Sequence, residues 1–230
     1  MAKEKIKTAK EERSGLITRD YKTTLETREE NEQGIIEGRP IVYGEYADIG
    51  GMFRETIMPG ALDGCDLTDV RLCLNHDTGY VYARSRNNNA NSTMQLWADE
   101  MGLSFRASLA INESPKAKDY YSAVNRRDMD KMSFMFAIAD EEWDDIDTDY
   151  PTRRILKLAT VVEISAVTFP AYEATSINAR DKAALESARL ALENAKQSRA
   201  NENPLESAGN TLELEKARFD FLTKFKHEGA

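Results

Sequence analysis

The sequence predicts a mainly β fold with helices, of the α+β class. Three observations indicate it: short apolar or alternating runs separated by turn residues, one proline-initiated helix between them, and a C-terminal zone of strong helix formers. A core is feasible because 41% of the 230 residues are hydrophobic. The charged fraction of 31% exceeds the usual share of about a quarter, so the excess is expected on extended or helical surface.

Composition divides the chain into three zones. Residues 1–33 are charged and show little apolar periodicity, so they are expected to form a mobile N-terminal arm, partly helical. Residues 34–180 contain most of the aromatic residues and both tryptophans, and they are expected to form the folded domain. Residues 181–230 are expected to form a helical, partly disordered tail that packs on a partner, with one helix over 181–200 and a second over 211–230.

Short strands are expected throughout the middle zone, bounded by Gly, Pro, Asn and Asp. Their predicted ranges are 35–44, 52–59, 70–75, 81–85, 92–99, 103–111, 131–139, 153–159 and 160–169. The segment 141–151 is expected to be an acidic loop closed by a proline.

One helix is predicted to interrupt these strands. Ser114 is its expected N-cap and Pro115 its first residue, a position where proline is well tolerated. Its apolar face would carry Ala117, Tyr120, Tyr121 and Val124.

The net charge of −9 disfavours nucleic acid as a partner, because basic residues are interleaved with acidic ones along the chain. No apolar run approaches the roughly 20 residues that a bilayer span needs, and the N-terminus shows no secretory signal. We therefore expect a soluble intracellular protein without membrane contact, whose Cys65 and Cys73 stay reduced.

Two residues are candidates for chemistry. His76 follows an apolar strand and is the only histidine of the middle zone, although a lone histidine is more often structural. Ser133 lies in a strand whose alternation places it on the face opposite Met132, Phe134 and Phe136. A serine there can simply fill a tight space. As a nucleophile it would need a base, and His76 is the imidazole on offer.

Glu163 is the candidate third member of such a site. It lies between Val162 and Ile164 and shares its face with Ser165. A buried carboxylate needs a partner, and a triad uses a carboxylate to orient its histidine. The alternative is a glutamate on an edge strand that faces water.

Four segments around these residues resemble one known family. They are MFRETIMPGAL (52–62), LCLNHD (72–77), DKMSFMFAIADEEWD (130–144) and RRILKLATVVEISAVTFPAY (153–172). The prohead, or capsid maturation, serine proteases of tailed bacteriophages, of the HK97 type, show similar E-x-I-x-P-G-A, N-H-D, M-S-F-x-F and E-[VI]-S-x-V-T-x-P-A segments in this order. Met135 departs from the family pattern, which often has glycine there, and a larger side chain would narrow the substrate cleft.

The resemblance implies a closed antiparallel β-barrel like that of herpesvirus assemblins, with flanking helices. It implies His76 as base, Ser133 as nucleophile and Glu163 as the acidic third member. It also implies an endopeptidase without a cofactor that cleaves scaffold, or the scaffold-like arm of the major capsid protein, and itself. The cleavage would take place inside the assembling prohead, in the cytoplasm of the bacterial host. The analogy with the family also allows a homo-oligomer.

Three rival interpretations come from other classes of protein. The first is a capsid assembly or scaffolding protein that keeps the fold but does not cut. The second is a cysteine enzyme using Cys73, disfavoured because residues 73 and 76 of one strand face opposite sides. The third is a calcium loop at Asp145, Asp147 and Asp149, disfavoured because residues 150 and 156 are not the glycine and glutamate such a loop needs.

Overall fold

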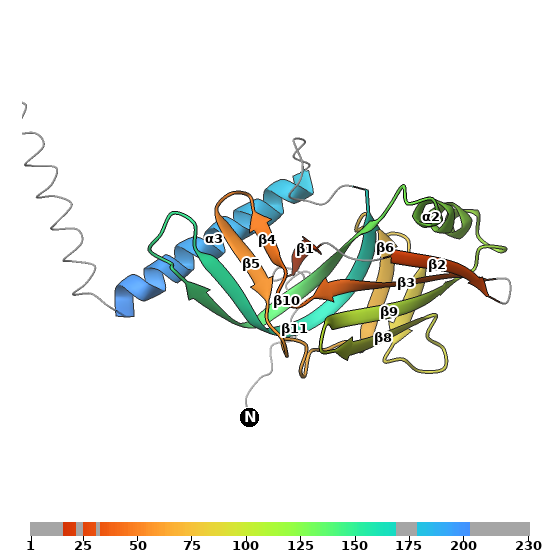
Figure 1. Ribbon diagram of the computed structural model, residues 1–230, viewed down its shortest axis with the longest axis horizontal. Coiled ribbons are helices and arrows are strands. Elements are labelled where there is room, and N and C mark those ends of the chain that lie inside the picture. Colours follow the sequence, from red (N-terminus) through yellow and green to blue (C-terminus); the bar gives the residue numbers. More distant parts are fainter. Residues whose placement is uncertain (1–15, 22–24, 31–32, 169–178, 203–230) are drawn as a thin grey trace, which may run out of the picture. The chain divides into compact units, whose positions relative to one another are not determined.

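The computed structural model describes residues 16–21, 25–30, 33–168 and 179–202. The chain divides into two compact units, residues 1–185 and 186–230. The first contains all the strands and helix α2, and the description of the site below belongs to it alone (Figure 1).

The elements follow one another in a mainly β order. They are β1 (Ile17–Tyr21), β2 (Leu25–Glu30), β3 (Gln33–Val42), β4 (Tyr46–Ile49), β5 (Phe53–Ile57), β6 (Asp69–Leu74), β7 (Ala83–Arg86), β8 (Met94–Asp99), β9 (Gly102–Leu109), α2 (Pro115–Asn125), β10 (Lys131–Asp144), β11 (Thr152–Val167) and α3 (Ala179–Glu202).

The described strands form two sheets. One contains β1-β10-β11-β5-β4, with β6 also paired to β11 and β7 paired to β6. The other has the order β2-β3-β9-β8. Most neighbours are antiparallel, but β11 runs parallel to β5 at residues 152–155 and to β6 at residues 163–166. The mainly β prediction with flanking helices is confirmed. The ladders of the described residues do not close into a ring, so the predicted closed barrel is not confirmed.

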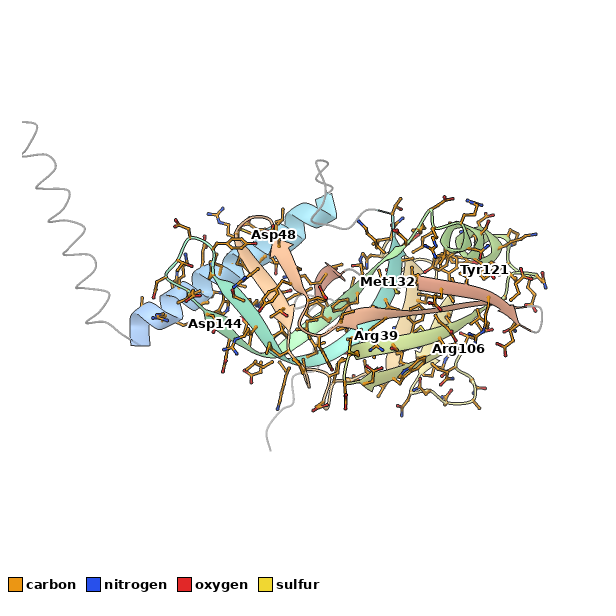
Figure 2. All side chains as sticks on the ribbon, viewed as in Figure 1. Arg39, Asp48, Arg106, Tyr121, Met132 and Asp144 are labelled. Carbon is orange, nitrogen blue, oxygen red and sulfur yellow. The ribbon has the colours of Figure 1, made fainter. Side chains whose placement is uncertain are left out.

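One apolar core joins both sheets and α2. Alternate residues of each strand point into it, which is the period-2 pattern of a half-buried strand. Its buried members include Ile36, Phe105, Tyr120, Phe134 and Ile164. The outer face of the second sheet carries charged pairs instead, with Arg106 bound to Glu37 and Arg39 bound to Asp99 (Figure 2).

The predicted helix is confirmed in detail. The Ser114 side chain accepts a hydrogen bond from the backbone N–H of Ala117, and Pro115 begins the helix. Its buried residues are Ala117, Tyr120, Tyr121 and Val124, the face that the sequence predicted.

Two predictions about the long strands are wrong. The ranges 153–159 and 160–169 were expected as separate strands, but β11 runs without a break from Thr152 to Val167. The acidic loop is also shorter than expected, because residues 141–144 still belong to β10. Glu141 and Glu142 of β10 pair with Arg153 and Arg154 of β11, so charge pairs extend the ladder where apolar periodicity stops.

The expectation of a mobile, partly helical arm is wrong for residues 17–21, which form β1, and for residues 25–30, which form β2. Strand β1 adds to the outer side of β10, and β2 adds to β3. These strands have few apolar residues of their own. Strand β1 pairs with a strand distant in sequence, whereas β2 forms a hairpin with the strand that follows it. Strand β4 also went unpredicted. Residues 1–15 lie outside the described residues.

In the C-terminal zone, α3 confirms the first predicted helix. The second, over 211–230, lies outside the described residues. The boundaries proposed for the three zones stay a prediction.

Candidate active site

Strand β10 places Ser133 inside the larger sheet, between β1 and β11. Ser133 lies opposite Ser165 of β11 and is fully buried. Its neighbours Met132 and Phe134 point into the apolar core, as the alternation predicted. Ser133 therefore lies on the face of β10 that points away from the core, and β10 is paired with a strand on each side, β1 and β11.

Strand β11 supplies two adjacent polar side chains on that face. Glu163 and Ser165 are two residues apart, so they point the same way. Glu163 is 2% exposed, which rules out the alternative of an edge glutamate facing water. The Ser165 hydroxyl donates a hydrogen bond to Oε1 of Glu163 and also accepts one from the His76 backbone N–H at 3.0 Å. Ser165 thus connects the carboxylate to the histidine backbone.

His76 follows β6 in a tight turn. Both Asn75 and His76 have left-handed backbone, with φ of 49° and 58°. Such backbone is uncommon for residues other than glycine, though Asn and His adopt it more often than most, and it concentrates at functional sites. The turn is held by the Asn75 N–H, which donates to the Ala166 carbonyl at 3.0 Å, and by Thr168, whose N–H donates to the Asn75 side chain at 2.9 Å.

The three predicted residues meet in one hydrogen-bonded line. Nε2 of His76 lies 2.6 Å from Oγ of Ser133, and Nδ1 lies 2.6 Å from Oε2 of Glu163. These contacts join residues 57 and 87 positions apart in sequence. They arise because β10, β11 and β6 are neighbours in the sheet, with Ser133 opposite Ser165 and Ser165 opposite Cys73.

The chemistry of the groups fixes the direction of these bonds. An ionised carboxylate only accepts, so Nδ1–H of His76 donates to Glu163. Nε2 of the neutral ring then faces the serine as an acceptor, which is the tautomer that a general base requires. The ring side chain is 14% exposed, so it reaches the surface while Glu163 does not. The arrangement can take a proton from the serine and stabilise the resulting imidazolium.

Helix α2 supports the segment that follows His76. The rings of Tyr80, Tyr82 and Tyr120 contact in series, with centroids 4.8 and 4.6 Å apart, and the Tyr80 hydroxyl bonds Ser114. The hydroxyl of Tyr120 accepts a hydrogen bond from the Ala166 N–H at 3.3 Å. Burial, with the Glu163 charge adding, raises the pKa of Tyr120, so it stays neutral.

Strand β1 brings a residue to the site that sequence reasoning missed. The Oγ of Ser133 lies 3.0 Å from the carbonyl oxygen of Arg19, to which it can donate. The side chain of Arg19 is itself buried against Glu55 of β5. The apparent lack of apolar pattern in residues 1–33 hid this strand, and no signal in the sequence tied Arg19 to Ser133.

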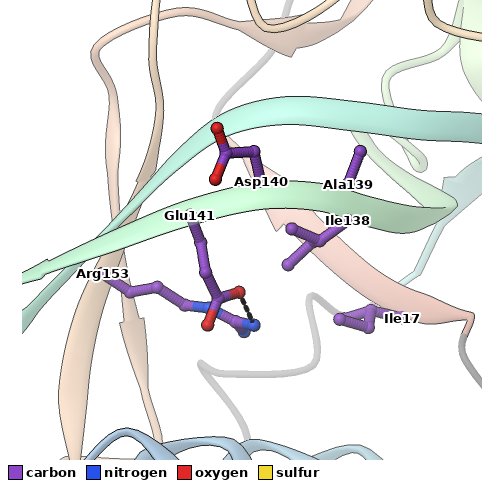
Figure 3. Close-up of a pocket in the computed structure, with 6 residues that line it drawn as sticks. All are labelled: Ile17, Ile138, Ala139, Asp140, Glu141 and Arg153. Carbon is purple, nitrogen blue, oxygen red and sulfur yellow. Dashed lines mark hydrogen bonds and ion pairs between the residues drawn. The ribbon is translucent and has the colours of Figure 1, made fainter. Parts of the chain in front are cut away.

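A pocket with a volume of about 440 Å³ lies beside β1 and further along β10. It is lined by Ile17, Ile138, Ala139, Asp140, Glu141 and Arg153. Figure 3 shows the ion pair of Arg153 with Glu141 at its wall, with Ile17 on the opposite side. The pocket therefore borders the same strand that covers the serine.

Two arginines at the start of β11 are held in ion pairs. Arg153 binds Glu55 and Glu141, and Arg154 binds Glu142 and Asp144. Burial, with the charge of Glu163 adding, raises the pKa of the Cys73 thiol to about 12. Because the thiolate is the reactive form, Cys73 is a poor nucleophile here.

In the part of the chain that the structure describes, His, Cys, Asp and Glu side chains form no group of three or more that could hold a metal ion. Across the same residues, no helix is long and apolar enough to cross a membrane.

The comparison with protein families agrees with the predicted family. The family model described as caudovirus prohead serine protease matches residues 21–188. Among solved structures, the capsid assembly protease of bacteriophage T4 matches with a TM-score of 0.41 and 11% identity, over 67% of this chain and 98% of that one. No curated protein matches the chain in sequence.

Proposed function

Because the chain belongs to the caudovirus prohead serine protease family, we propose that it is a phage prohead serine endopeptidase with Ser133 as nucleophile, His76 as general base and Glu163 as the carboxylate that orients the base. The observation that supports these roles most is the continuous line of two 2.6 Å contacts from Glu163 through His76 to Ser133. The family itself is one of serine peptidases that act in capsid maturation.

In the proposed reaction, Oγ of Ser133 bonds to the carbonyl carbon of a substrate peptide while its proton passes to Nε2 of His76. The C–N bond then breaks, and the leaving nitrogen takes that proton from His76. Water adds to the acyl ester by the same route and releases the new carboxylate. Glu163 stays ionised throughout and stabilises the imidazolium that forms in each half.

The proposed substrates are the scaffold, or the scaffold-like arm of the major capsid protein, and the protease itself. The reaction would take place inside the assembling prohead, in the cytoplasm of the infected host. The closed barrel and a homo-oligomer that the resemblance implies also belong to this proposal.

Co-expression with the major capsid protein of the same phage tests this function. Intact chain should give the capsid protein a new N-terminus on sequencing, and Ser133→Ala should not. Trimming by the Ser133→Ala chain would remove the nucleophile from the proposal. An untrimmed capsid protein with both chains would instead favour the rival, a capsid assembly protein that does not cut.

A further inference from the structure

Arg19 occupies an unusual environment for a residue near the start of the chain. It lies on a five-residue strand at the edge of the larger sheet, yet it is 1% exposed. Arginine is almost never fully buried unless its charge is paired. A buried anionic group is therefore expected to pair with the guanidinium of Arg19.

The receiving group is Glu55 of β5, which is fully buried. Nε of Arg19 lies 2.5 Å from Oε1 of Glu55, and Nη2 lies 3.1 Å from Oε2. This is the two-pronged geometry by which a carboxylate distinguishes arginine from lysine. Nη1 of Arg19 donates to the carbonyl oxygen of Thr18 at 2.9 Å.

The backbone of the same residue faces the serine. Strand β1 runs antiparallel to β10, with Arg19 opposite Phe134 and residue 20 opposite Ser133. The carbonyl oxygen of Arg19 lies 3.0 Å from Oγ of Ser133. An extended segment added to the edge of a sheet is a general way of binding a peptide, in which backbone bonds give affinity and side-chain pockets give specificity.

The hydroxyl of Ser133 has one hydrogen and two acceptors within reach, Nε2 of His76 and the carbonyl oxygen of Arg19. A carbonyl at this place competes with the base for that hydrogen. With β1 in place the serine is also fully buried, so another peptide reaches it only when β1 leaves.

Glu55 is fully buried between two cations, Arg19 and Arg153. Removal of Arg19 takes one of these cations away from the buried carboxylate. A buried charge with less compensation is costly, so the vacated space favours another cation over a neutral or acidic side chain.

We propose that β1 lies where a substrate strand binds, and that Glu55 is a specificity-determining residue that selects arginine as the residue whose carbonyl Ser133 attacks. The inference rests on the proposed function and names the substrate class of that site. The substrate is an extended peptide cleaved on the carboxyl side of an arginine, with lysine accepted less well because it cannot bond both carboxylate oxygens in the same way.

The test uses the full chain and a peptide with the sequence of residues 15–21, GLITRDY, flanked by a fluorophore and a quencher. Arg19→Ala removes the ion pair that anchors β1 while Glu55 keeps Arg153 as a partner. This variant should cleave the peptide after its arginine at least about ten-fold faster than the wild-type chain. It should prefer arginine over glutamine at that position by about 100-fold in kcat/KM.

Glu55→Gln in the Arg19→Ala chain should reduce that preference to less than about ten-fold, because the buried charge is gone. Glu141→Gln in the same chain is the matched control. Glu141 also binds Arg153 but has no ion pair with Arg19, so the preference for arginine should persist.

The outcomes separate this inference from the function on which it rests. Cleavage by Arg19→Ala without a preference for arginine, or with a preference that survives Glu55→Gln, overturns the selection by Glu55. A wild-type chain as fast as Arg19→Ala overturns the placement of β1 in the substrate site. Absence of cleavage of both the peptide and the capsid protein by every chain overturns the proposed function, and this inference with it.

Discussion

Glu163 uses both carboxylate oxygens, one for the His76 ring and one for the Ser165 hydroxyl. A buried carboxylate with two such partners is satisfied, and its negative charge is available to stabilise an imidazolium. Glu163 therefore both orients the His76 ring and stabilises its positive charge. A substitution by a neutral residue of the same shape separates the electrostatic role from the geometric one.

Glu163→Gln should lower kcat/KM by about 10³- to 10⁴-fold, because the amide cannot stabilise the imidazolium and can present the wrong group to Nδ1. Circular dichroism should show an unchanged fold. Activity within about ten-fold of the wild-type chain would mean that Glu163 is not the third member of the triad.

His76 and Ser133 should act as one catalytic unit, because the proton transfer across their 2.6 Å contact needs both side chains. His76→Ala and Ser133→Ala should each reduce kcat on the order of 10⁴- to 10⁶-fold, and the double variant should be no worse. The comparison needs only single-turnover rates on one peptide. Additive losses in the double variant would show that the two residues contribute independently.

Two of the three residues of this line have a chemical reason to stand out in sequence, whereas Ser133 was singled out by the resemblance of its M-S-F-x-F segment to the family. A lone histidine after an apolar strand and a carboxylate within a run of Val and Ile both require explanation. Ser165 was noted only for its shared face, because serine is common in strands. Arg19 carries no such signal, since a charged residue in a short amphipathic segment normally faces water. Glu55 begins the E-x-I-x-P-G-A segment of the family, but that resemblance assigned it no role.

At the scale of elements, one glycine in the hairpin of β8 and β9 determines how closely a neighbouring strand can approach. Gly102 begins β9 with φ of 137°, and a Cβ built on it would lie 2.0 Å from the Ile41 carbonyl oxygen. Only glycine fits where β3 approaches this closely, and the clash involves backbone that cannot rotate away.

Gly102→Ala should therefore lower the free energy of unfolding by about 3 kcal/mol or more, through strain and displacement of β3. Gly51→Ala is the matched control, because Gly51 also has positive φ, at 69°, but a Cβ there meets nothing within 4 Å. Its cost should be about 1 kcal/mol. Urea denaturation of the two variants checks the difference, and equal midpoints would contradict it.

The sequence predicted an element correctly where its local residue pattern matches the contacts that the element makes in the fold. The helix at Pro115–Asn125 has a cap, a proline and a four-residue apolar face, and all are used. The pattern failed at the turn end of the hairpin of β10 and β11, where Arg153 and Arg154 pair with acids across the ladder instead of apolar residues facing a core. It failed again at β1, whose partners on β10 are more than a hundred residues away, and at β2, which forms a hairpin with residues 33–38 of β3.

At the scale of the whole molecule, one core holds the three strands that bring the site together. Residues of both sheets and of α2 contribute to it, so the 2.6 Å contacts depend on packing far from the serine. The strand order could not have been read from the sequence. Strand β11 pairs parallel with both β5 and β6, and these long-range pairings leave no local trace.

The central claim is that the fold makes Ser133 a nucleophile through His76. Mass spectrometry of full-length Arg19→Ala chain treated with a fluorophosphonate tests it most directly, because that variant should expose the serine without changing the triad. One covalent adduct should form on Ser133, and His76→Ala in the same chain should abolish it. An unmodified Ser133, or an adduct that forms equally well without the imidazole, would contradict the account.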